Sequence, residues 1–264
     1  MVVIRAGETA RRMEPSIEEM LRESPRTLSV IQMGISDADI DAFAQNTTLL
    51  ELTLIVVEMD DAKSARLARL LASHANLTIL RLGYNMLGNA GAISLSINTH
   101  LHTLFLDECG IDDAGALALA LNPTLRALSL AFNAIGDAGA IALAHNSALS
   151  NLDLNFNRVG DAGAEAFART MTLCTLSLHS NAIGERGASA LAASLCAGNA
   201  RALIDAELRH IKRRIGQHAH GALSRYVDTG NFSLRKVDIY KNGGVAASTH
   251  QCIRAALRVR AGWK

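Results

Sequence analysis

LSLAFNAIGDAGAIALAHNSA, residues 128–148, is followed by LDLNFNRVGDAGAEAFARTMT, residues 152–172, with the same residue types in the same order. Leucines 24 positions apart open the pattern L-x-x-L-x-L-x-x-N-x-[ILV], in which Cys once replaces Asn; they are Leu77, Leu101, Leu125, Leu149 and Leu173. A shortened unit (Leu28–Leu49) and a lengthened unit (Leu49–Leu77) precede these five. Self-similarity at a fixed period indicates a repeat architecture, which we expect over residues 28–195.

Each unit combines two kinds of periodicity. Leu128 and Leu130 alternate with small residues such as Ser129, which is typical of a strand with one buried face. The alanine-rich segment that follows Asp137 predicts a short helix with a buried side. Since one unit cannot cover its own apolar face, the units must stack. The predicted fold is α/β: a solenoid with a curved parallel sheet inside, α-helices outside and helical caps.

These units resemble the leucine-rich repeat family, in the ribonuclease-inhibitor-like subtype, in which an α-helix follows each strand. The segments GALALALNPTL (residues 115–125), GAIALAHNSAL (139–149) and GASALAASL (187–195) are also similar to the repeats of GALA-type effectors, which bacterial pathogens inject into host cells. The resemblance covers about residues 77–195 and implies a scaffold that binds a protein, in this case a host protein. The F-box that members of that group carry has no counterpart in residues 1–27, so we do not expect a ubiquitin-ligase adaptor.

Recurring polar and glycine columns have structural explanations. We expect an amide ladder where the chain leaves each strand, with Cys109 as one of its members and not a nucleophile; its amides are Asn85, Asn133, Asn157 and Asn181. Short acceptors at the helix starts are expected to cap those helices; they are Asn89, Asp113, Asp137 and Asp161. Glycines on the first helical turn, such as Gly139, are expected to let helix and strand approach closely.

The two ends depart from the 24-residue period. Residues 1–27 are predicted to be a helical cap, because Ser16 and Glu19 form an S-x-x-E capping box. Residues 196–264 are predicted to be a basic lobe with inserted helices and a capping helix over residues 246–259. Within this lobe, Leu234, Val237 and Asn242 restore the repeat pattern, so residues 234–242 are predicted to add a strand to the same sheet.

Charge divides at the same boundary. Residues 1–200 hold 13 Lys and Arg against 21 Asp and Glu, whereas residues 201–264 hold 13 against 4. The basic end could dock on anionic lipid or on an acidic protein surface, or it could be a solvated face that offsets the acidic repeats. No aromatic stacking platform accompanies these charges, so we do not expect nucleic-acid binding.

Signals for a membrane span, an enzyme or a metal are weak. The longest apolar runs fall far below the about 20 residues needed to cross a bilayer. The first residues hold no hydrophobic block of signal-peptide length, so we expect a cytoplasmic protein, or one secreted without a Sec signal into a host cell. His210, His218 and His220 lack a neighbouring carboxylate or cysteine that would complete a metal site. We predict no catalytic residue, metal or cofactor.

The partner-binding residues are expected on the concave face, where side chains alternate with the buried leucines. The candidates are Arg81, Phe105, Asp107, Glu108, Asp153, Asn155 and His179. Phe105 is either an aromatic anchor for the partner or a ring that lies against its strand neighbours. A second exposed stripe, or a stack of structural spacers, is expected from Tyr84, Phe132 and Phe156. The alternative function is an effector with an enzymatic activity in the C-terminal lobe, such as ubiquitin transfer through Cys252 or Cys196.

Overall fold

The computed structural model describes residues 2–5, 16–23, 25–31, 34–55, 61–170, 172–197 and 236–238. Its strands are β1 (Val2–Arg5), β2 (Thr27–Ile31), β3 (Glu51–Ile55), β4 (Ile79–Arg81), β5 (Thr103–Phe105), β6 (Ala127–Ser129), β7 (Asn151–Asp153), β8 (Thr175–Ser177) and β9 (Lys236–Asp238). Its helices are α1 (Ile17–Arg22), α2 (Asp37–Gln45), α3 (Asp61–Ala72), α4 (Gly88–Ser96), α5 (Asp113–Ala120), α6 (Asp137–Ala144), α7 (Asp161–Ala168) and α8 (Glu185–Ala197).

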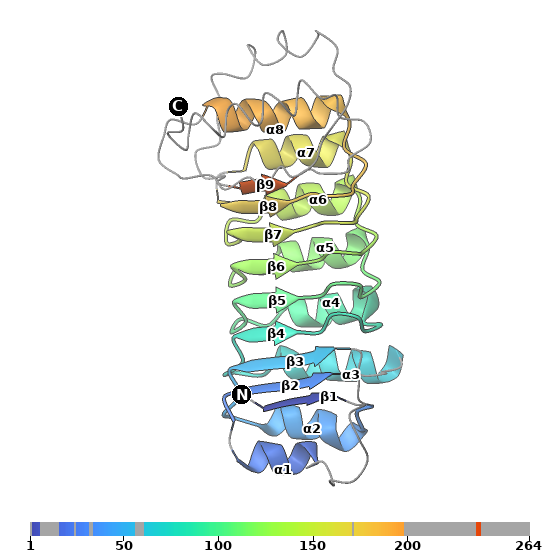
Figure 1. Ribbon diagram of the computed structural model, residues 1–264, viewed down its shortest axis with the longest axis vertical. Helices are drawn as coiled ribbons and strands as arrows, with labels where there is room; N and C mark the ends of the chain where they lie inside the picture. The colour runs from blue at the N-terminus through green and yellow to red at the C-terminus, as the bar shows by residue number, and fades with distance from the viewer. Residues whose placement is uncertain are drawn as a thin grey trace.

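The described strands form one parallel sheet in sequence order from β1 to β9, and α3 to α8 lie side by side along one of its faces (Figure 1). The 24-residue period sets the register, because Leu104, Leu128, Leu152 and Leu176 each pair with the next in line. This arrangement confirms the predicted α/β solenoid. The sheet is open and uncurled, so its side away from the helices is called the strand face below.

The core follows the leucine columns. In the repeat that contains β6, Leu128, Leu130 and Ile135 meet Leu143 from α6, and all four side chains are buried. The same positions are buried in the neighbouring repeats, so one hydrophobic cluster runs from Ile17 in α1 into α8. Each repeat is therefore held mainly by burial against the repeats on either side.

The predicted amide ladder is confirmed at the strand exits. The Asn133 Nδ2 donates to the carbonyls of Leu106 (2.8 Å) and Leu130 (3.0 Å). Its Oδ1 accepts from the amides of Cys109 (3.2 Å) and Ile111 (2.9 Å) in the preceding repeat. One side chain thus satisfies backbone groups of two repeats.

The predicted caps act on a different helix. Asp137 is the first residue of α6, yet its Oδ1 accepts from the amides of Gly160 and Gly163, both at 2.8 Å, at the start of α7. Asp113 and Asp161 make the same pair of bonds to α6 and α8. The prediction that these carboxylates cap their own helices is therefore wrong. Stacking at one period places the next helix start within reach, where a negative charge is also favourable.

The glycine of the first helical turn makes room for a neighbouring helix. A Cβ on Gly139 would lie 2.9 Å from the Cβ of Ala116 in α5 and 2.8 Å from the Oδ1 of Asp113. The predicted close approach of helix and strand is thus corrected to an approach between consecutive helices.

A second amide ladder, which the sequence analysis did not identify, runs along the helix ends. The Asn122 Oδ1 accepts from the amides of Thr124 and Leu125, both at 2.9 Å. Its Nδ2 donates to the carbonyls of Ser96 (2.8 Å) and Asn98 (2.7 Å) in the preceding repeat. The buried Asn98 and Asn146 make equivalent bonds.

The two ends show partial agreement with the sequence. The capping box of Ser16 and Glu19 is confirmed at α1, but β1, which pairs with β2, was not predicted. At the other end, β9 pairs with β8 and sets Val237 opposite Leu176, which confirms the strand predicted within residues 234–242. The inserted helices and the capping helix over 246–259 lie outside the described residues. The boundaries at residues 27 and 195 stay predictions.

Replacing Asn122 with Ala should lower the free energy of unfolding by about 1–3 kcal/mol, because buried backbone groups in two repeats lose their partners. Asn151→Ala is the matched control, since Asn151 is exposed on β7, and it should change stability by less than about 0.5 kcal/mol. Urea unfolding of the full chain measures both. Equal effects from the two variants would contradict a ladder at the helix ends.

His74 occupies one position of this second ladder. Its side chain is buried, and its Nδ1 accepts from the Leu77 amide at 3.1 Å. The Nε2 is buried with no hydrogen-bond partner among the described residues. Burial lowers the pKa of His74 below its ordinary value of 6.5, and the nearby His100 adds to this, whereas the Asn46 backbone opposes it.

The pH dependence of stability follows from that direction. As pH falls below 6.5, the unfolded chain binds a proton at His74 that the folded chain resists, so the free energy of unfolding should fall. His74→Asn restores the ladder amide and should reduce this acid sensitivity, whereas His102→Asn, at an exposed site, should not. Thermal melts above and below pH 6.5 measure the difference. Identical pH profiles for the wild type and His74→Asn would refute the assignment.

Candidate functional site

The predicted partner-binding residues fall into two groups on the strand face. Arg81 on β4, Phe105 on β5 and Asp107 just after β5 form the first group. The second consists of Asp153 on β7 with Asn155 and His179, which follow β7 and β8. The repeat of β6 separates the two groups with small side chains, namely Ala127, Ser129 and Ala131.

Phe105 is covered by its neighbour. The guanidinium carbon of Arg81 lies 4.0 Å from the centre of the Phe105 ring, and the Arg81 Nε donates to Glu51 on β3 at 3.2 Å. A cation over an aromatic face is a favourable contact. Phe105 therefore lies against a strand neighbour, which is one of the two roles considered for it, and the pair presents a half-buried surface rather than a free ring.

Several predicted polar residues hold adjacent repeats together. Asp107 accepts from the Ser129 hydroxyl and from the Ala131 amide (3.0 Å). The Asn155 Oδ1 accepts from the His179 amide at 2.6 Å, and the Asp153 Oδ1 accepts from the Asn155 amide at 2.8 Å. These bonds fix the side chains in place, so the strand face presents a preorganised set of acceptors.

The most exposed aromatic side chains lie one position before the amide ladder. Tyr84, Phe132 and Phe156, which we call the aromatic edge, are 50%, 46% and 39% exposed. Phe132 and Phe156 stack with ring centres 4.1 Å apart, and His179 meets Phe156 edge-on at 5.0 Å. The sequence analysis left open an exposed stripe or a stack, and both features are present.

The backbone of the aromatic edge is in the left-handed region. The φ angles of Tyr84, Phe132 and Phe156 are 62°, 56° and 55°, and Glu108 and Ser180 adopt the same conformation in their repeats. The turn thus imposes this conformation whatever residue occupies the position. A side chain with a Cβ pays roughly 1–2 kcal/mol there, which glycine avoids. Large rings at this position are therefore not a requirement of the turn.

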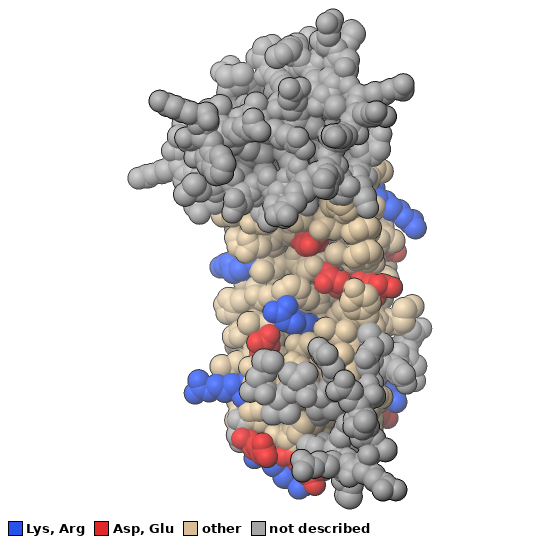
Figure 2. All heavy atoms as spheres, in the orientation of Figure 1, with Lys and Arg blue, Asp and Glu red and all other residues tan. Residues whose placement is uncertain are grey.

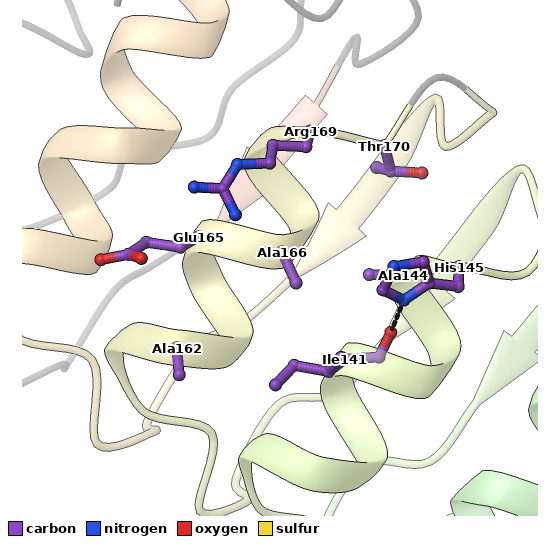
Figure 3. A pocket seen from close by; sticks show the side chains of 8 residues that line it. All are labelled: Ile141, Ala144, His145, Ala162, Glu165, Ala166, Arg169 and Thr170. Carbon is purple, nitrogen blue, oxygen red and sulfur yellow. Dashed lines mark hydrogen bonds between the residues drawn. The ribbon is translucent and has the colours of Figure 1, made fainter.

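A groove of about 340 Å³ lies on the opposite side of the molecule, between α6 and α7. The small side chains of Ala162 and Ala166 line it together with Ile141, His145 and the charged residues of α7 (Figure 3). The His145 Nδ1 is 2.7 Å from the Ile141 carbonyl. The Glu165 carboxylate pairs with Arg186 of α8 at 2.6 Å. None of the residues predicted to bind a partner lines this groove.

Charge is sparse on the face drawn in Figure 2, where isolated Lys, Arg, Asp and Glu residues interrupt a largely uncharged surface. Within the described ranges, His, Cys, Asp and Glu side chains do not gather in threes where they could hold a metal ion. In the same part of the chain, no helix has the length and apolar character to span a bilayer. His210, His218, His220 and Cys252 lie outside the described residues, as does the side chain of Cys196.

A family model described as a leucine-rich repeat matches residues 73–96, 98–120, 121–144, 145–168 and 171–192. These matches fall on the strand-and-helix units described above. The chain is a leucine-rich repeat protein.

Solved structures with detectable similarity include two repeat proteins. Internalin C2 of Listeria monocytogenes is 26% identical, with a TM-score of 0.46, over 63% of this chain and 67% of that one. Actin-binding site 2 of leiomodin-1 is 15% identical, with a TM-score of 0.31, over 87% of this chain and 91% of that one. A search of the curated proteins finds no match. Membership of the ribonuclease-inhibitor-like subtype stays a prediction for this leucine-rich repeat protein.

Cys109 serves as a ladder residue of this leucine-rich repeat protein. Its Sγ donates to the Leu82 carbonyl at 3.2 Å, and burial raises the pKa of the thiol to about 12. Since the thiolate is the nucleophile, this thiol should be inert at neutral pH.

Alkylation of the folded chain with iodoacetamide should therefore modify Cys174, which is half-buried, well before Cys109. Unfolding in urea should remove the difference, because both thiols then have ordinary pKa values. Peptide mass spectrometry over time reads each site separately. Equal rates for the two cysteines in the folded chain would show that Cys109 is not sequestered.

Proposed function

We propose that this leucine-rich repeat protein is a non-enzymatic scaffold that binds a partner protein through the strand face and the aromatic edge. The observation that carries the proposal is the aromatic edge, where rings stand exposed in a left-handed turn that does not require them. Covering those rings removes apolar surface from water, and aromatic anchors supply much of the binding energy at protein interfaces.

The strand face supplies the surroundings of these anchors. Asp107, Asp153 and Asn155 are held by bonds to the backbone, so little side-chain freedom is lost when a partner meets them. Arg81 and Glu51 offer an ion pair beside the Phe105 ring. The small side chains of the β6 repeat leave space between the two polar groups. We therefore assign partner contact to Arg81, Phe105, Asp107, Glu108, Asp153, Asn155 and His179 together with the aromatic edge.

The nature of the partner is the finer part of the proposal. The similarity of the G-A-x-A-L-A units to GALA-type effector repeats supports a bacterial effector that binds a host protein, either as a cytoplasmic protein or after delivery into the host cell without a Sec signal. Opposed charges within the strand face favour a partner with a mixed polar surface over a polyanion.

Affinity capture from host lysate with the full chain tests this function. A partner bound by the wild type should be lost from the Phe132→Ala/Phe156→Ala double variant, because two anchors are removed at once. Leu50→Ala is the control, since Leu50 is a large exposed side chain away from the aromatic edge. With the captured protein purified, the double variant should raise Kd at least about tenfold.

Both aromatic residues lie on the surface, so the melting temperature of the double variant should stay close to that of the wild type. Unchanged affinity in the double variant would move the binding site away from the strand face. Loss of binding in Leu50→Ala as well would point to general instability or to nonspecific capture.

A further inference from the structure

Two outward positions on each helix, four residues apart, carry an irregular pattern within the regular repeats. The first position is occupied from α3 to α7 by Arg69, Ile93, Leu117, Ile141 and Glu165, and the second by Ser73 (just after α3), Ile97, Leu121, His145 and Arg169. Both positions therefore hold polar residues at α3 and at α7. The large aliphatic residues gather on the three repeats between them.

These aliphatic residues are exposed. We call Ile93, Ile97, Leu117, Leu121 and Ile141 the helix patch; Leu121 and Ile97 are 85% and 74% exposed, and the other three are exposed as well. Consecutive helices α4, α5 and α6 pack side by side, so the patch is continuous across them (Figure 1). Contiguous apolar surface of this kind marks an interaction site. The polar residues at the equivalent positions of α3 and α7 show that the fold does not need it.

The charges at the two ends of the helix patch are opposite. Arg69 and Glu165 lie at the first outward position, two repeats before and two repeats after Leu117. A half-turn about an axis that runs along α5 reverses the order of the helices and keeps positions along them. It places Leu117 against Leu117 of a second copy, Ile93 against Ile141, and Arg69 against Glu165.

From this complementarity we propose that the chain forms a two-fold symmetric dimer through the helix patch, with the symmetry axis at α5. Symmetry of this type requires a self-complementary surface, and the sequence of cation, three aliphatic residues and carboxylate provides one. Each interface contains the pairing of Arg69 with Glu165 twice.

The size of the surface fits a dimer. Five helices spaced about 10 Å apart, each at least about 12 Å long, present roughly 600 Å² on each copy. A standard stable interface covers about 800 Å² on each partner, which the side chains between the helices and around them can supply. The protruding Ile97 of one copy comes next to the groove between α6 and α7 of the other, where the alanines leave room for it.

Sedimentation velocity of the full chain across a wide range of concentrations tests the proposal. The wild type should form a dimer, and Leu117→Glu should raise its Kd at least about tenfold, because it places two carboxylates together at the symmetry axis. Leu50→Glu is the matched control, at an exposed leucine outside the helix patch. A wild type that stays monomeric, or a dimer that Leu117→Glu leaves intact, would overturn the proposal.

Charge reversal tests the two-fold arrangement itself. Arg69→Glu and Glu165→Arg should each weaken the dimer, and the double variant Arg69→Glu/Glu165→Arg should restore it, because each pair is re-formed with its charges exchanged. Single reversals without effect, or a double variant as weak as the singles, would refute this arrangement in favour of another occupant such as a helix of a different protein. Thermal melts confirm that Glu165→Arg, which also loses the contact with Arg186, remains folded.

A cysteine on the axis gives a direct readout. Leu117→Cys should form a disulfide between copies under mild oxidation, since the two residues 117 face one another, whereas Leu50→Cys should behave as the wild type does. A cross-link that is equally efficient at both positions would argue against the axis at α5. None of these variants touches the aromatic edge, so failure of the dimer and failure of partner binding are separate results.

Discussion

Hydrogen bonding between neighbouring repeats is the constraint on which the structure depends. A unit of 24 residues leaves backbone groups at its strand exit, its helix start and its helix end that it cannot satisfy alone. Asn133, Asp137 and Asn122 each bond to an adjacent repeat at one of these points. Where Cys109 replaces the amide, the Leu87 amide donates instead to the Asn85 carbonyl at 2.9 Å. The ladder thus tolerates a thiol only because a local acceptor is close.

The three ladders and the leucine columns use most positions of each repeat, and this restricts where function can reside. Changes at Leu128 or Asn122 disturb the neighbouring repeats as well as their own. The freely variable positions are those on the strand face, at the aromatic edge and on the outward side of the helices. Both proposals rest on such positions, because residues there depart from what the period or the turn requires. Phe132 and Leu121 are examples on opposite sides of the molecule.

The sequence predicted what the 24-residue period carries explicitly, including the fold, the buried leucines and the ladder of Asn133. It even placed Val237 in the correct register of β9. It misassigned Asp137 because capping the same helix and capping the next one require the same residue at the same spacing. It missed β1, since VVIR lacks the leucine pattern. The cover that Arg81 gives Phe105 depends on a side-chain rotamer across two strands, which no periodicity encodes. The second ladder was visible in the sequence, because Asn98, Asn122 and Asn146 share the period of the leucines.

The two proposed surfaces lie on opposite sides of the sheet, because the helices cover one face and the strand face is the other. A dimer through the helix patch therefore points its two strand faces in opposite directions. One small partner cannot reach both faces, so the second site adds no avidity toward it. A partner that is itself repeated, or displayed many times on a surface, can engage both sites and gain effective concentration without any new contact. The back-to-back arrangement thus suits a scaffold that links copies of its partner better than one that encloses a single molecule.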